Sequence, residues 1–252
     1  MQNQAQGIQV SLGIPFLFST AGYYHSKGCG EDDLMHYALV HFSGSRKEFM
    51  PPYISIGGYS DPPRIAHLSV EVSKGELVVV SGGPGSGKSN LIKSVAGIRP
   101  FDKGTIKLMG SRAGTLRSRN NTVFVFQSDN FSPELPVNLQ LQRKTALLLG
   151  KSPRDMRSKV TKWSADMELE DRMSCLPGEL NRSELQLFSL APLAIVKPMV
   201  AVLDEPVIEL SPILASLAMS FLIPMLEESA VLAACRSRSP LTAKADRVVN
   251  LV

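Results

Sequence analysis

Residues 82–89 read Gly-Gly-Pro-Gly-Ser-Gly-Lys-Ser and match the pattern GxxxxGK(S/T) at every fixed position. Glycines allow a backbone to curl around an anion and to direct its N–H groups towards it. Lys88 adds a positive charge for the β- and γ-phosphates of a nucleotide, and the Ser89 hydroxyl can ligate Mg²⁺. The residues predicted to bind the nucleotide are Gly82, Gly83, Pro84, Gly85, Ser86, Gly87, Lys88, Ser89 and Asn90.

The sequence on either side of this loop supports the prediction. Residues 76–80 form a short apolar run that is typical of a buried parallel strand, and residues 89–97 place apolar side chains at helical spacing. A strand, a loop and a helix in this order put the phosphates at a helix N-terminus, where the helix dipole favours anions. The alternative, a chance glycine-rich turn, does not explain this context.

Composition sets the broad class of protein. The chain has 252 residues, of which 44% are hydrophobic and 20% charged, as in an ordinary globular protein with one large or two small domains. A net charge of +4 suits a polyanionic ligand but is too weak to indicate nucleic acid binding. The three cysteines are far apart and are expected to be reduced thiols. Neither a signal peptide nor a transmembrane helix is predicted, so a membrane role requires another chain.

Strand and helix patterns alternate along most of the chain. Strands are predicted at residues 68–72, 105–108, 122–126, 199–203, 230–235 and 247–252. Helices are predicted at residues 139–149, from Ser152 towards Asp166, from about 181–183, and from Ser211. We expect Ser183 and Gln186 to form a capping box, Pro192 to kink that helix or end its first half, and Pro198 to terminate it.

This alternation predicts an α/β fold with a mostly parallel sheet flanked by helices. Residues 1–50 are expected to be an N-terminal extension of unknown role, with a possible strand at 37–42. Residues 51–252 form the predicted nucleotide-binding domain. Its core comprises 51–127 and 185–252, and its helical subdomain comprises 128–184, which lacks strand signals.

A second motif supplies the carboxylates that a magnesium nucleotide site needs. The apolar run at 199–203 ends in Asp204-Glu205-Pro206. Asp204 is expected to hold Mg²⁺ through water, and Glu205 to polarise an attacking water as the catalytic base. An acidic turn after a strand is common by itself, but its pairing with the loop at 82–89 favours the functional interpretation.

From Tyr53 to Val252 the chain resembles the ATP-binding-cassette (ABC) transporter ATPases. The resemblance is carried by the loop with the helix after it, by residues 124–127, by residues 203–206, and by the closing run at 245–249. The 116 residues from Lys88 to Asp204 (204 − 88) leave room for the helical lobe of that family. Residues 127–149 look most similar to the lipoprotein-release and macrolide-exporter type. The implied fold is that of a RecA-like P-loop NTPase with an inserted helical subdomain and an antiparallel β edge.

The resemblance also implies further roles. Gln127 would contact both the Mg²⁺ and the attacking water, and would signal nucleotide state to the helical lobe. Tyr59 would stack on adenine, with Tyr53 as a competitor for this role. The implied cofactors are ATP and Mg²⁺. The implied partners are a membrane-spanning transporter subunit and a second ATP-binding subunit, in a homo- or heterodimer, and no nucleic acid. The chain would then lie in the cytoplasm on the inner face of a membrane.

Three places in the sequence depart from the family pattern. Where these ATPases have the signature LSGGQ, this chain has Leu180-Asn181-Arg182-Ser183-Glu184. Such residues suit a helix cap, although Arg182 could instead offer charge to a phosphate. The position of the switch histidine falls on Arg236, which binds phosphate but cannot accept a hydrogen bond. Ser211 replaces the aspartate of the loop after Glu205.

These observations predict an ATP-binding subunit of an ABC transporter in which ATP binding is intact and ATP hydrolysis, if present, is slow. The loss of one preorganised charge-stabilising group costs about 3 kcal/mol, or roughly a hundredfold in rate. One alternative is a regulatory pseudo-ATPase of the same fold that binds ATP with negligible turnover. Another is a different P-loop enzyme, such as a small-molecule kinase.

Overall fold

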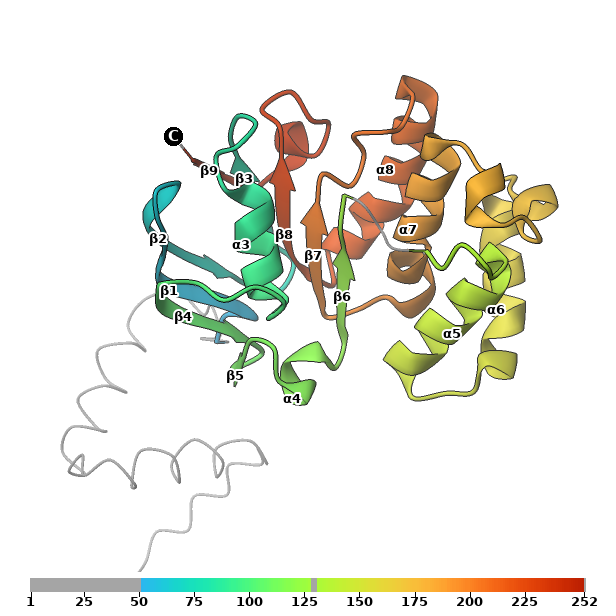
Figure 1. The fold of residues 1–252 in the computed structure, drawn as a ribbon, viewed down its shortest axis with the longest axis horizontal. Coiled ribbons are helices and arrows are strands. Elements are labelled where there is room, and N and C mark those ends of the chain that lie inside the picture. The colour runs from blue at the N-terminus through green and yellow to red at the C-terminus, as the bar shows by residue number, and fades with distance from the viewer. Residues whose placement is uncertain (1–50, 128–130, 252) are drawn as a thin grey trace, which may run out of the picture. The chain divides into compact units, whose positions relative to one another are not determined.

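The computed structural model describes residues 51–127 and 131–251. The chain divides into two units, Met1–Phe49 and Met50–Val252, and the described residues all belong to the second. The possible strand at 37–42 lies outside the described residues. Within them, the chain forms two sheets and a group of helices (Figure 1).

The central sheet is parallel and has the strand order β6-β7-β8-β3-β9. Its strands are β3 (Leu77–Ser81), β6 (Thr122–Val125), β7 (Val200–Asp204), β8 (Ala230–Cys235) and β9 (Arg247–Asn250). Every residue of β3, β7 and β8 is buried, which is why these strands read as continuous apolar runs. The carboxyl ends of the three strands reach one edge of the sheet, where Ser81 pairs with Cys235 and Asp204 with Ala234.

The antiparallel strands form a sheet of their own, with the order β2-β1-β4-β5. They are β1 (Ile54–Asp61), β2 (Ile65–Val72), β4 (Lys103–Leu108) and β5 (Ser111–Arg112). Their inner side chains share one apolar core with helix α3 (Lys88–Val95) and with one face of the parallel sheet. Helix α3 is therefore held between the two sheets, which fixes the end of the loop that precedes it (Figure 1).

Four longer helices cover the opposite face of the parallel sheet and extend beyond it (Figure 1). They are α5 (Val137–Leu149), α6 (Pro153–Asp166), α7 (Arg182–Val196) and α8 (Pro212–Leu226); the short helices are α4 (Leu116–Arg119), η1 (Glu170–Arg172), η2 (Pro177–Glu179) and η3 (Thr242–Lys244). Helix α7 links α5 and α6 to the sheet, because its Phe188 packs on Trp163 of α6 with 5.7 Å between ring centroids. Among residues 51–127 and 131–251, no helix is both long enough and apolar enough to cross a membrane.

Most predicted strands and helices are confirmed, but the predicted capping box of α7 is wrong, and of the two alternatives for Pro192 a break is excluded while a kink stays a prediction. The capping box consists of Asn181 and Glu184 rather than Ser183 and Gln186. Pro192 does not end the helix, which continues to Val196. A proline inside a helix costs about 3 kcal/mol. Here the burial of the residues around Pro192 offsets that cost, because α7 is packed on both sides.

Gly97 provides a test of how α3 is anchored. It has φ +69°, and a methyl group added to it would lie 2.1 Å from the Cα of Gly114. We expect Gly97→Ala to destabilise the protein by about 3 kcal/mol, from left-handed strain together with a backbone clash. Gly110→Ala is the matched control, because Gly110 has φ +74° but open space at that position. Gly110→Ala should lower the free energy of unfolding, measured in urea, by about 1 kcal/mol. If Gly97→Ala and Gly110→Ala lost the same free energy of unfolding, the close packing of Gly97 on Gly114 would be contradicted.

Candidate nucleotide-binding site

The loop between β3 and α3 forms an open cradle. Gly85 and Gly87 have φ values of +82° and +97°, so only glycine adopts this path without strain. No atom lies within 4 Å of the position that a methyl group would take on Gly83 or Gly85. The Ser86 Oγ is buried and has no hydrogen-bond partner among the described residues. A cradle with open glycines and an unpaired buried hydroxyl fits a phosphate group at the N-terminus of α3.

Lys88 extends back over the loop from the first position of α3. Its side chain is nearly buried, and Nζ donates to the carbonyl oxygens of Gly82 at 2.7 Å and Gly83 at 2.9 Å. The same Nζ lies 4.0 Å from Oε1 of Glu205. The ammonium group is thus positioned between the cradle and the carboxylate of the second motif, as a phosphate-binding lysine requires.

Two of the three predicted metal ligands, Ser89 and Asp204, lie in contact. The Ser89 Oγ donates a hydrogen bond of 3.1 Å to Oδ1 of Asp204, although the two residues are 115 positions apart. Asp204 is 2% exposed, and burial raises the pKa of its carboxyl, against the hydrogen bond from Ser89 and the charges of Lys93 and Lys88. A hydroxyl and a carboxylate in contact are oxygen ligands of the kind that Mg²⁺ takes, and the metal role of this pair stays a prediction.

Glu205 is held in a strained conformation beside this pair. Its φ of +48° lies in the left-handed region, which is unusual for a residue with a Cβ and is often found at functional sites. Its carboxylate accepts a hydrogen bond of 3.3 Å from the Arg236 backbone N–H and lies 3.9 Å from Arg236 Nε. Burial raises the pKa of Glu205, while the charges of Lys88 and Arg236 oppose this rise. Arg236 therefore contacts the carboxylate that the sequence assigns to the attacking water.

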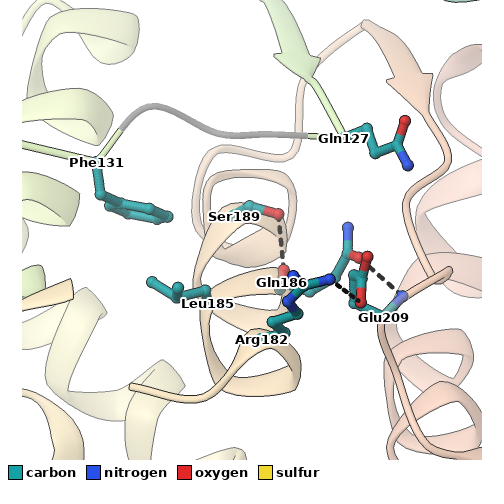
Figure 2. A pocket seen from close by; sticks show the side chains of 7 residues that line it. All are labelled: Gln127, Phe131, Arg182, Leu185, Gln186, Ser189 and Glu209. Carbon is teal, nitrogen blue, oxygen red and sulfur yellow. Dashed lines mark hydrogen bonds and ion pairs between the residues drawn. The ribbon is translucent and has the colours of Figure 1, made fainter. Parts of the chain in front are cut away.

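Gln127 lies in a separate cavity of about 390 Å³ (Figure 2). The residues that line this cavity are Gln127, Phe131, Arg182, Leu185, Gln186, Ser189 and Glu209. Gln127 is exposed, and no hydrogen bond joins it to Ser89 or Asp204 within the described part of the chain. The structure thus brings Gln127 towards the first turn of α7, and its roles towards Mg²⁺ and water stay predictions.

The first turn of α7 is bonded to the loop that follows Glu205. Arg182 lies 3.8 Å from a carboxylate oxygen of Glu209 (Figure 2). The Ser183 hydroxyl donates a hydrogen bond to the Glu209 carbonyl. Gln186 accepts a hydrogen bond of 3.2 Å from the Glu209 backbone N–H. The predicted capping role of Asn181 is confirmed. The residues at the signature position therefore make contacts within their own chain.

The predicted stacking of Tyr59 on adenine is wrong. The Tyr59 side chain is fully buried, its hydroxyl lies 3.4 Å from Ser94 Oγ, and its ring packs on Phe101 with 5.4 Å between centroids. A ring enclosed by β1, α3 and Phe101 has no face available for a ligand.

Sequence reasoning missed two arginines beside the loop. Arg64 and Arg99 line a cavity of about 390 Å³ together with Gly85–Asn90. Arg99 pairs with Asp61 at 3.2 Å, and Asp61 also accepts a hydrogen bond from the Asn90 side chain at 3.1 Å. The side-chain amide of Asn90 is therefore engaged within the protein. No motif marks these arginines, because they come from the β1–β2 turn and from the segment after α3.

Comparison with known proteins agrees with this geometry. The sequence profile described as "ABC transporter" matches residues 65–208. The chain is 30% identical over 171 residues to the glutamate/aspartate import ATP-binding protein GltL of Escherichia coli, covering 65% of this chain and 70% of GltL. It is 33% identical over 150 residues to the thiamine import ATP-binding protein ThiQ of Salmonella choleraesuis, covering 58% of this chain and 63% of ThiQ. The chain belongs to the ABC transporter family.

Solved structures show the same fold. An ATP-binding subunit of an ABC transporter superposes with a TM-score of 0.70 at 20% identity, over 79% of this chain and 85% of that one. A dimeric ATP-binding cassette in a post-hydrolysis state, bound to ADP and Pi, also superposes with a TM-score of 0.70. The sequence identity is 18%, and the match covers 79% of this chain and 94% of that one. The α/β P-loop fold predicted from the sequence is confirmed.

The raised pKa of Asp204 gives a stability test. Because burial raises this pKa above its unfolded value, the ionised carboxylate destabilises the fold. This penalty is absent below the ordinary aspartate pKa of about 3.9 and fully present above the raised folded value. We expect Asp204→Asn to melt at a higher temperature than the parent at pH 7, without nucleotide or metal, and the gain to shrink as pH falls towards about 4. Asp102→Asn, at an exposed position, is the matched control for the loss of one carboxylate. A lower melting temperature of Asp204→Asn than of the parent at pH 7 would contradict the argument.

Proposed function

We propose that this chain binds MgATP at the loop 82–89 and serves as the nucleotide-binding subunit of an ABC transporter. The observation that carries the proposal is the 3.1 Å contact between Ser89 and Asp204 directly below an open phosphate cradle. Lys88 supplies the positive charge for the phosphates, and the backbone N–H groups of the loop orient them. Ser89 and Asp204 hold the Mg²⁺, with Gln127 as a third ligand when the nucleotide is bound.

Glu205 is the residue best placed to act as the base in ATP hydrolysis. It is nearly buried, adjoins Asp204 in sequence and lies within 4.0 Å of Lys88. Arg236 limits this reaction, because a permanent positive charge beside a carboxylate makes it a weaker base. Turnover is therefore slow, about a hundredfold below that of a site with a complete set of catalytic groups.

The partners follow from the relatives. GltL and ThiQ are named as import ATP-binding proteins, and one structural neighbour is a dimer. We propose that this chain likewise pairs with a second ATP-binding subunit and with a membrane-spanning subunit, at the cytoplasmic face of a membrane. The domain division proposed is an extension at 1–50, a nucleotide-binding core at 51–127 and 185–252, and a helical subdomain at 128–184 that contacts the membrane partner.

The nucleotide site is tested by Lys88→Ala. Loss of the ammonium group removes the main charge for the phosphates, so ATP affinity should fall by at least about a hundredfold, more than one charge-assisted hydrogen bond provides alone. Titration calorimetry with MgATP measures the change. Lys159→Ala, on an exposed position of α6, is the control and should bind ATP as the parent does. An unchanged affinity in Lys88→Ala would rule out this site.

The limit on hydrolysis is tested by Arg236→His. A neutral imidazole removes the permanent charge beside Glu205 and can accept a hydrogen bond, so steady-state ATP turnover should rise about tenfold or more. Arg238→His changes a neighbouring arginine in the same loop that has no ion pair with Glu205, and it should leave turnover unchanged. If Arg236→His has the same turnover as the parent, Arg236 is not what slows the reaction.

A further inference from the structure

The cavity beside the phosphate loop contains no aromatic side chain among its described lining residues. It has a volume of about 390 Å³, within the range of roughly 300–1,000 Å³ that is usual for small-molecule sites. One wall is the loop and the first turn of α3, and the other wall is Arg64 and Arg99. The base of a nucleotide whose phosphates lie in the loop would extend along this cavity. It needs a flat partner there, which Tyr59 does not supply because its ring is enclosed in the core.

Arg64 is fixed against the loop in a way that orients its guanidinium group. Its Nε donates a hydrogen bond of 3.1 Å to the Gly85 carbonyl. Its Cβ lies so close to Gly87 that a methyl group added to this glycine would be 3.1 Å away. Both contacts tie the β1–β2 turn to the loop. They leave the side chain exposed, so the face of a rigid, planar cation is accessible beside the phosphate cradle.

The neighbouring Arg99 is occupied differently. Its guanidinium pairs with Asp61, and the same carboxylate binds Asn90, so the charge of Arg99 is compensated inside the protein. Within residues 51–127 and 131–251, Arg64 has no carboxylate within 4.0 Å. Of the two arginines in this cavity, only Arg64 therefore carries a positive charge that is not already neutralised.

We propose that the guanidinium plane of Arg64 stacks on the base of the bound nucleotide and takes the place of an aromatic ring in this site. The proposal rests on the proposed function, because it assumes that the loop holds the phosphates. A guanidinium group stacks on aromatic rings through its flat face and its charge together. Arg64 is thus a base-binding residue. It raises the affinity for a nucleotide above the affinity for a phosphate chain that carries no base.

The experiment compares two ligands, MgATP and magnesium tripolyphosphate, by titration calorimetry on the full chain. Arg64→Ala should weaken ATP binding about tenfold, through the loss of stacking and of one nearby charge, and weaken tripolyphosphate binding clearly less, through the loss of the charge alone. Arg64→Trp should keep ATP affinity within about twofold of the parent, because an indole offers a flat face without the charge. Arg64→Lys keeps the charge but loses the plane, and it should bind ATP nearly as weakly as Arg64→Ala.

Several outcomes would overturn the proposal. They are unchanged ATP affinity in Arg64→Ala, equal losses for ATP and tripolyphosphate, or full ATP affinity in Arg64→Lys together with weak binding in Arg64→Trp. The last two would make Arg64 a phosphate contact. Lys88→Ala serves as the reference and should lose both ligands. If the parent binds neither ligand, the proposed function fails; if it binds both and Arg64→Ala behaves as the parent does, only the stacking proposal fails.

Discussion

The contact between Ser89 and Asp204 depends on how the parallel sheet is ordered. Ser89 follows β3 and Asp204 ends β7, and β8 lies between these two strands. The hydroxyl reaches the carboxylate because α3 crosses this edge of the sheet and is held there by the core that it shares with the antiparallel sheet. The second sheet, although distant in sequence from Asp204, is therefore part of what makes the site. A shift of α3 by about one ångström would break this hydrogen bond between Ser89 and Asp204.

Burial and charge act against each other in this site. Asp204 and Glu205 are adjacent and nearly buried, so both carboxyls have raised pKa values. Two buried carboxylates would repel one another, and the cations of Lys88 and Arg236 reduce that repulsion. Bound Mg²⁺ would take over part of this compensation when it joins Asp204. The Arg236 side chain lies 3.9 Å from Glu205 and is 61% exposed, so solvent screens its charge more than that of the nearly buried Lys88.

The sequence predicts the parts of the site that depend on local pattern and fails where tertiary packing decides. The loop 82–89 and the run that ends in Asp204 are recognisable because their residue types are dictated by a phosphate and by burial. Tyr59 is different, because β1 carries register shifts on both sides of it, and simple alternation then does not tell which way the ring points. Arg64 gives no sequence signal at all, since its role comes from a turn folded against Gly85.

The first turn of α7 contacts the loop after Glu205 through interactions that differ in exposure. Arg182 is 84% exposed, and its pair with Glu209 at 3.8 Å is worth little in water. The bonds of Ser183 and Gln186 to Glu209 are less exposed and run through the backbone of the loop after Glu205. Gln186 also lies 3.5 Å from the Glu205 carbonyl. The first turn of α7 is therefore fixed to the loop after Glu205 mainly through Ser183 and Gln186, while the exposed pair of Arg182 and Glu209 adds little.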